Sequence, residues 1–240
     1  MRDLPRLYAP VVIDLDVRPV SGSRAEATFP LLLLAALVPL LLWSFAFTPG
    51  GRLNWLLEVG PGLIGIALLA AFFPRFPMSR WSSGCVFLHV LILIYGGHYT
   101  YARTPLGNWA METFDLARNH YDRVGHFALG FFPAFLIKEI LIRKTPLRPG
   151  GWLFFIAISI ALAIGAFWEF IEWWAALILD PEGGQKFLGS QGDVWDAHWD
   201  MLLALVGATV ALLALGRAHE RSMRALFQRA RAGASLSRAA

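Results

Sequence analysis

Six long apolar runs divide this chain and limit the folds open to it. They cover residues 29–47, 56–73, 81–96, 122–142, 152–179 and 195–215. About 20 helical residues cross the hydrocarbon core of a bilayer, where each backbone polar group must be satisfied without water. We therefore predict an all-α fold, a polytopic transmembrane helix bundle of about six spans. Pro61 and Gly62 are expected to kink the second helix or delay its start.

The composition favours a membrane protein over an ordinary soluble domain. Hydrophobic residues make up 57% of the 240 residues and charged residues only 16%, whereas soluble domains carry about 25% charged residues. A net charge of +4 could suggest nucleic acid, but the basic residues lie in short segments between the runs, where membrane topology explains them. The expected partner is the lipid bilayer, with no nucleic acid. The single cysteine, Cys85, excludes an internal disulfide and a cysteine-based zinc site.

The distribution of lysine and arginine predicts the orientation of the chain. Sixteen of these residues fall on the two terminal segments and alternate loops, and five fall on the opposite side. Cytoplasmic segments carry the excess of positive charge, so both termini are expected in the cytoplasm. The predicted organisation is a cytoplasmic or interfacial arm at 1–28, a six-span domain at 29–216 and a basic cytoplasmic tail at 217–240. His219 and this tail are expected at the lipid surface.

With this topology, most of the candidate chemistry falls on the outward side. The groups lie at the ends of the third and fifth runs and at the starts of the fourth and sixth: His98; Glu169 and Glu172; Asp122 and His126; Asp193, Asp196 and Asp200. Charged groups inside a membrane segment are costly and are usually paired or functional. We therefore predict one outward-facing polar pocket. Glu139 falls on the inner side and is expected to pair with Lys138 or Arg143.

Some of these groups also have a purely structural interpretation. Asp193 could cap the sixth helix, with Asp196 completing a capping box. Asp122 could cap the fourth helix or pair with a neighbouring arginine. Capping cannot explain Asp200, because it lies about two turns inside its helix. Glu169 lies among aromatic residues and has no simple structural role.

Several carboxylates and histidines in a low dielectric cannot all stay charged and unpaired. A bound metal, shared protons or pairing with arginine would each resolve the conflict, and carboxylate with imidazole suits Zn, Mn or Fe. The candidate metal ligands are Asp122, His126, Glu169, Asp196 and Asp200. The candidate catalytic residues are Asp122, His126, Glu169 and Asp200. Candidate substrate-binding residues surround them: His98, Tyr101, Asn119, His120, Arg123, Glu172, Gln191, Asp193 and Asp196.

Four segments carry a resemblance to a known family. They are GGHYTYAxxPLG at 96–107, NHYDRxGHFxxG at 119–130, ExxEWWAAL at 169–177 and FLGSQGDxWDxxWDM at 187–201. Together they resemble the YjdF-type bacterial inner-membrane proteins over about residues 30–216. More distantly, 122–127 and 196–207 resemble the VanZ-like proteins, in which the position of Asp200 is usually Asn. The resemblance implies a bacterial inner-membrane location and supplies no activity.

Three functions follow from these patterns. The first is a pocket that binds or processes an envelope lipid or lipid-linked group, with a divalent metal as a candidate cofactor. If it is an enzyme, hydrolysis or group transfer is the expected class, with a carboxylate as base and His126 as acid or base. The second is a small proton-coupled transporter, which would need polar pathway residues in the inner halves of the fourth to sixth runs, and we interpret these halves as purely apolar. The third is a non-catalytic structural network.

Overall fold

The computed structural model describes residues 24–179, 184 and 187–239, and all their regular structure is helical. The prediction of an all-α membrane bundle is therefore confirmed. The elements are α1 (Arg24–Phe47), α2 (Arg52–Phe72), α3 (Arg80–Tyr99), the 3₁₀ helix η1 (Tyr101–Arg103), α4 (Pro105–Thr113), α5 (Tyr121–Phe131), α6 (Pro133–Lys144), α7 (Gly151–Ile178) and α9 (Asp196–Ala239). Most of the predicted arm at 1–28 and the loop residue Lys186 lie outside the described residues.

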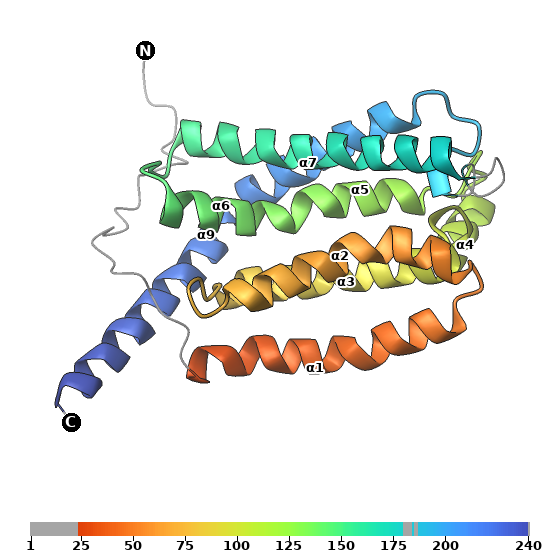
Figure 1. Cartoon of the computed structure of the whole chain (residues 1–240). Helices are drawn as coiled ribbons and strands as arrows, with labels where there is room; N and C mark the ends of the chain where they lie inside the picture. Colours follow the sequence, from red (N-terminus) through yellow and green to blue (C-terminus); the bar gives the residue numbers. More distant parts are fainter. Residues whose placement is uncertain (1–23, 180–183, 185–186, 240) are drawn as a thin grey trace, which may run out of the picture.

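Six segments are long and apolar enough to cross a membrane, as predicted. They are Glu26–Phe47, Arg52–Phe72, Arg80–Tyr99, Tyr121–Lys144, Gly151–Ile178 and Asp196–Ala232. They run side by side along one direction, with α4 at one end of the bundle (Figure 1). We call the end that carries α4 the site end. The sidedness inferred from lysine and arginine remains a prediction.

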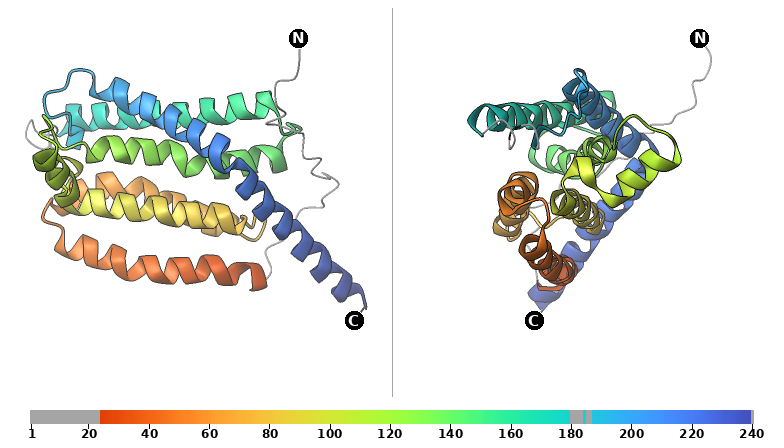
Figure 2. Two further views of the ribbon diagram at one scale, coloured as in Figure 1. Left: turned by 180° about the vertical axis from the view of Figure 1, so that it is seen from behind. Right: turned by 90° about the vertical axis from the view of Figure 1, so that its right-hand side faces the viewer.

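Two helices differ from the sequence-based expectation. α2 begins at Arg52 and continues through Pro61, because Trp55 and Val59 before the proline pack against Val90 and Ile94 of α3 and favour the helix there. α9 continues without interruption past residue 216 to Ala239. Its second half leaves the bundle past the start of α1 (Figure 2).

The fourth span consists of two helices. α5 ends at Phe131 and α6 begins at Pro133. Proline has no backbone N–H and clashes with the preceding turn, so it favours a new helix start over continuation. The break separates a polar half, which carries Asp122 and His126, from a half whose buried face packs on α7 and α9.

The buried apolar side chains form two separate clusters. One joins α1, α2 and α3 around Leu37, Trp55 and Val59. The other joins α3, α6, α7 and α9 around Phe135 and Met223. Helices α2 and α7 face each other across the space between the clusters, and this division leaves room for a cavity inside the bundle.

Small residues allow α5 and α9 to approach unusually closely. A Cβ on Gly130 would overlap the backbone oxygen of Ala204, and one on Gly207 would overlap the backbone oxygen of Phe127. Gly165 of α7 also faces Ala204, its Cβ position lying 2.9 Å from that methyl group. In membranes, where helices gain little from apolar burial, such close packing is a main source of association. This contact brings the first turns of α9 against the polar half of α5.

A second polar cluster lies at the opposite end of the bundle. It corrects the expected position of His219 and the expectation that the spans are purely apolar there. Glu139 is fully buried and accepts hydrogen bonds from the Ser79 hydroxyl (2.8 Å), the Ser82 hydroxyl (2.7 Å) and the Arg143 guanidinium (2.7 Å). His219 lies 3.3 Å from Glu139 and is also fully buried, so the prediction that it lies at the lipid surface is wrong.

The same end holds a further ion pair. Lys138 bonds Glu220 at 2.7 Å, and Arg143 is therefore the partner of Glu139. The parts of the fourth and sixth spans at this end, which were expected to be purely apolar, thus carry buried charged groups. The sixth helix was expected to end near residue 215, and its continuation is what carries His219 and Glu220 into the interior.

Replacing Gly130 with alanine tests the close approach of α5 and α9. Overpacking of a tight contact costs about 1–3 kcal/mol, so we expect Gly130→Ala to unfold at a lower temperature in detergent. Gly60→Ala is the matched control, because a Cβ at Gly60 meets no atom within 4 Å. Thermal unfolding measured by tryptophan fluorescence would compare them. Equal stability of the two variants would contradict the assigned helix contact.

Candidate functional site

Four of the predicted outward groups come together at the site end from three helices. α5 contributes Asp122 and His126 from its first turns, α7 contributes Glu169 near its end, and α9 contributes Asp200. Asp122, His126 and Asp200 are 6%, 3% and 2% exposed, so the group is almost completely buried. We call these four residues the acid–histidine cluster.

The distances within this cluster are too long for good hydrogen bonds. His126 Nε2 lies 3.7 Å from Asp122 Oδ1 and 3.5 Å from Glu169 Oε1. Asp122, His126 and Asp200 each present one ligand atom within 4.8 Å of the other two. His126 Nδ1, Glu169 Oε1 and Asp200 Oδ1 have no hydrogen-bond partner among the described residues. Unsatisfied buried polar atoms are costly and unusual in a native fold, so this cluster needs an explanation beyond packing.

The arginines at this end neutralise other carboxylates. Arg118 forms an ion pair with Asp196 and donates to the carbonyl oxygens of Gly189 (3.3 Å) and Ser190 (3.0 Å). Arg123 binds Asp193 at 2.5 Å. Asp196, a predicted metal ligand, is therefore held by an arginine.

Asp193 combines two roles. Its Oδ1 accepts from the backbone N–H of Trp195 at 2.9 Å, and its other oxygen accepts from Arg123. The capping expectation thus agrees with this geometry, although Asp196 pairs with Arg118 instead of completing a capping box.

Asn119 and Gln191 fasten the loop before α9 to the start of α5. The Asn119 backbone N–H donates to Gln191 Oε1 at 3.1 Å, and Gln191 Nε2 donates to the Asn119 carbonyl at 2.9 Å. The Asn119 side chain also accepts from the backbone N–H of Tyr121. These two predicted substrate-binding residues therefore shape the rim of the cluster.

Glu172, His120 and Tyr101 differ in their positions. Glu172 is buried and accepts from Trp168 Nε1 at 2.7 Å.

Partial burial, aided by Arg123 and Arg118, lowers the pKa of His120, which favours the neutral imidazole. Tyr101 packs so closely on Gly96 and Gly125 that a Cβ at either glycine would crowd its ring. Burial and nearby carboxylates raise the pKa of Tyr101 well above its ordinary value, so its hydroxyl stays protonated.

His98 lies apart from the cluster. Its Nδ1 lies 3.3 Å from the Ser44 hydroxyl, and its ring stacks on Trp43 at 4.6 Å between centroids. The Ser44 hydroxyl in turn accepts from Trp55 Nε1. The structure thus places this predicted substrate-binding residue in a contact between α1, α2 and α3.

Glu58 was not among the sequence candidates, yet it belongs to this region. It lies on α2, is 5% exposed and shares a cavity wall with Asp122, His126 and Tyr101. The sequence did contain an indication of this role, because Glu58 lies within the second apolar run. A charged group there carries the same cost of burial as Glu169 and is usually paired or functional. What the sequence did not reveal is that α2 faces α5.

A cavity of about 390 Å³ extends from the cluster into the bundle. Its polar groups gather at one end, and the rest of its wall is apolar, supplied by α2, α3, α5, α6 and α7. The principal apolar wall residues are Pro61, Ile66, Leu69, Val90, Leu93, Leu129, Leu136, Ile164, Phe167 and Ile171. Such a shape, apolar with a few convergent polar groups, is typical of small-molecule and lipid sites.

Comparison with known proteins identifies the family. Residues 29–221 match the family model described as "Predicted membrane protein (DUF2238)". The chain belongs to this family. The inner membrane protein YjdF of Escherichia coli (strain K12) is 44% identical over 173 residues, which cover 72% of this chain and 82% of that protein. No solved structure matches the chain.

These comparisons confirm the resemblance to YjdF-type proteins and the location. With six spans and an inner-membrane relative, the chain is a multi-pass protein of the bacterial inner membrane. The matched region contains every residue of the acid–histidine cluster. The family description names a membrane protein and no reaction, so any function must be argued from the site.

Replacing Arg118 tests the ion pairs that hold the rim. Removing one partner of a buried ion pair costs about 3–5 kcal/mol, and the Arg118 side chain is 7% exposed. We expect Arg118→Gln to unfold at a clearly lower temperature, whereas the exposed Arg103→Gln stays near wild type. Adding Asp196→Asn to Arg118→Gln should recover part of the loss. Additive losses in the double variant would contradict the pairing.

Proposed function

We propose that this protein binds a divalent metal ion through Asp122, His126 and Asp200 and uses it to hold the headgroup of an envelope lipid. The lipid's hydrocarbon chain would lie in the cavity between α2 and α7. The observation that carries the proposal is a buried set of three potential ligands, two of which, Asp122 and His126, line the polar end of an apolar cavity.

The spacing of the ligand atoms supports a metal. Zn–N and Zn–O bonds of about 2.0–2.2 Å place neighbouring ligands of a tetrahedral ion roughly 3.4 Å apart. The 3.7 Å between His126 Nε2 and Asp122 Oδ1 lies near this value, and one ligand atom each of Asp122, His126 and Asp200 lies within 4.8 Å of the other two. The 3.7 Å separation exceeds the 2.7–3.2 Å typical of a direct hydrogen bond. The ligand set of imidazole and carboxylates suits Zn, Mn or Fe.

The charge balance supports the same conclusion. Arg118 and Arg123 are bound to Asp193 and Asp196, so the carboxylates of the cluster have no ion-pair partner in the described chain other than His126. Burying uncompensated carboxylates is costly. A divalent cation would neutralise Asp122 and Asp200 and give Asp200 Oδ1 the partner that it lacks within the described chain.

The cavity supports a lipid ligand, and the metal defines its headgroup. Carboxylates alone would repel an anionic headgroup, whereas a metal bridges carboxylates to a phosphate oxygen. We therefore propose a phosphate-bearing headgroup. The same arrangement supports hydrolysis of a phosphoester, for which a metal held by Asp122, His126 and Asp200 would supply electrophilic activation. Glu169, 3.5 Å from His126, would accept a proton from the attacking water and return it to the alcohol oxygen as the P–O bond to the lipid alcohol breaks.

The transporter alternative has less support. The buried polar cluster around Glu139 could begin an inner pathway, but the layer between the two clusters is built by apolar side chains, including Phe131, Phe135 and Leu212. His89 lies within this layer, and its Nδ1 bonds the Ala128 carbonyl at 3.2 Å. A proton relay would need to bridge this layer.

Metal analysis of the purified protein tests the proposal. We expect about one transition-metal ion per chain by elemental mass spectrometry of protein handled without chelators. Changes near metal ligands commonly weaken binding roughly 10–100-fold, so Asp122→Asn, His126→Gln and Asp200→Asn should each lose most of the ion.

Asp193→Asn is the matched control, because Arg123 holds that carboxylate outside the cluster. It should keep the metal. Wild-type protein that stays metal-free after incubation with Zn²⁺, Mn²⁺ and Fe²⁺ would refute the metal centre and leave proton sharing as the explanation. Thermal unfolding of each variant separates loss of the ion from loss of the fold.

A further inference from the structure

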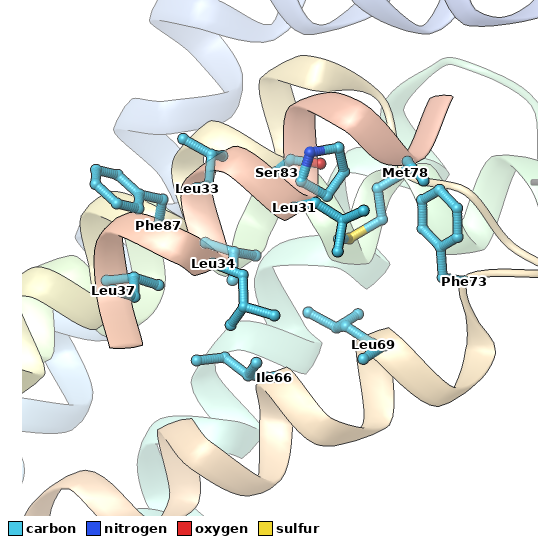
Figure 3. Close-up of a pocket in the computed structure, with 14 residues that line it drawn as sticks. Leu31, Leu33, Leu34, Leu37, Ile66, Leu69, Phe73, Met78, Ser83 and Phe87 are labelled. Atoms are coloured by element: carbon cyan, nitrogen blue, oxygen red, sulfur yellow. The ribbon is translucent and has the colours of Figure 1, made fainter. Parts of the chain in front are cut away.

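A second cavity of about 200 Å³ lies between α1, α2 and α3, toward the end of the bundle opposite the site. Figure 3 shows Leu34 of α1 facing Ile66 and Leu69 of α2, with Phe73 and Met78 farther along. Apart from Ser83, the side chains around it are apolar. Nothing in this wall could recognise a polar ligand, so it suits hydrocarbon.

The two cavities adjoin each other. Ile66, Leu69 and Val86 belong to the walls of both. We infer that the two cavities form one continuous apolar path that takes a single hydrocarbon chain longer than one bilayer leaflet is deep, such as that of a polyisoprenyl phosphate. This inference rests on the proposed function, because the metal site supplies the position of the headgroup.

The path is longer than the hydrocarbon depth of one bilayer leaflet. Along α2 it runs from Glu58 at the polar end to Phe73 just beyond the helix end, and a helical rise of 1.5 Å per residue makes this about 22 Å. One leaflet contributes about 15 Å of hydrocarbon. The first cavity alone, from Glu58 to Leu69, spans about 16 Å. The second cavity is therefore what extends the path beyond one leaflet.

The walls of the first cavity are shaped to admit a chain. Gly65 lines the cavity, and a Cβ added there would meet no atom within 4 Å, so the glycine leaves open space. The one imidazole in its middle, His89, already bonds a backbone carbonyl. The polar groups of the wall are thus concentrated at the acid–histidine end.

The arrangement favours one long chain over two short ones. Two acyl chains leave a common headgroup side by side, which requires both cavities to begin at the polar end. Here the second cavity begins at Ile66 and has no wall residue in common with the acid–histidine cluster. The cavities follow each other along α2, so a single chain can fill both and a diacyl lipid cannot.

Binding of isoprenyl phosphates of two lengths tests this inference. Native mass spectrometry of the zinc-loaded, detergent-purified protein would measure geranyl monophosphate as the short probe and solanesyl monophosphate as the long one. Because affinity grows with the apolar surface buried, we expect the long probe to bind roughly a hundredfold more tightly. A diacyl phosphatidate should bind no better than the short probe.

Two variants close the path beyond the first cavity. Leu69→Trp blocks the junction, and Leu34→Trp fills the second cavity. Each should reduce binding of the long probe to the level of the short probe and leave the short probe unchanged. Leu68→Trp is the matched control, since Leu68 is 53% exposed on the neighbouring face of α2. It should bind both probes as the wild type does.

The outcomes separate the two proposals. If both probes bind equally in a zinc-dependent way, or if phosphatidate binds as tightly as the long probe, the continuous path is refuted and the headgroup site stands. If the long probe binds more tightly but Leu69→Trp and Leu34→Trp leave it unaffected, the assigned path is also refuted. If neither phosphate binds the zinc-loaded protein, both the lipid function and the path are refuted.

Discussion

The close approach of α5 and α9 is the contact on which the rest of the site depends. Gly130 and Gly207 remove the side chains that would hold the two backbones apart, and Ala204 fills the interval between α5 and α7. Since side chains project from a helix at fixed intervals, this packing decides which of them face α5. It sets Asp200, one turn before Ala204, against Asp122 and His126. A wider separation would leave Asp200 of the sixth span apart from Asp122 and His126 of the fourth, each side with the full cost of burial.

The two polar clusters of the bundle compensate the burial of carboxylates and histidines in different ways. At the end opposite the site, the Glu139 carboxylate accepts from two serines and an arginine and contacts a histidine. At the site end, atoms of His126 and Asp200 lack partners within the described chain. Each cluster leaves one imidazole Nδ1 without a partner in the part of the chain that the structure describes, on His219 and on His126. The contrast lies in the carboxylates: both oxygens of Glu139 accept from protein donors, whereas Asp200 Oδ1 and Glu169 Oε1 have no partner among the described residues. This difference favours a ligand at the site end.

The sequence predicted the helices of this structure better than it predicted which helices and side chains contact each other. Six apolar runs are enough to predict six spans, because the bilayer sets a length that single-sequence patterns reveal directly. Motif spacing also placed Asp122 and His126 on one helix face. It could not show that Arg118 selects Asp196 rather than Asp122, since that depends on how the loop before α9 folds over α5. The position of His219 was predicted wrongly because it depends on α9 continuing past its apolar run. Glu58 was missed because its role depends on which face of α2 turns inward.

The division of the apolar interior into two clusters gives the cavity its place. A bundle with one continuous core would close α2 onto α5 and α7, and protein interiors normally leave few voids. Here the cluster around Trp55 and Val59 stabilises α1, α2 and α3, while the cluster around Phe135 stabilises the remaining spans. The region between them holds neither a packed core nor a polar network, and Asp122 and His126 of the acid–histidine cluster line one end of it. An empty apolar space of this size forfeits dispersion contacts on all its walls, and a hydrocarbon chain restores them without requiring a single hydrogen bond.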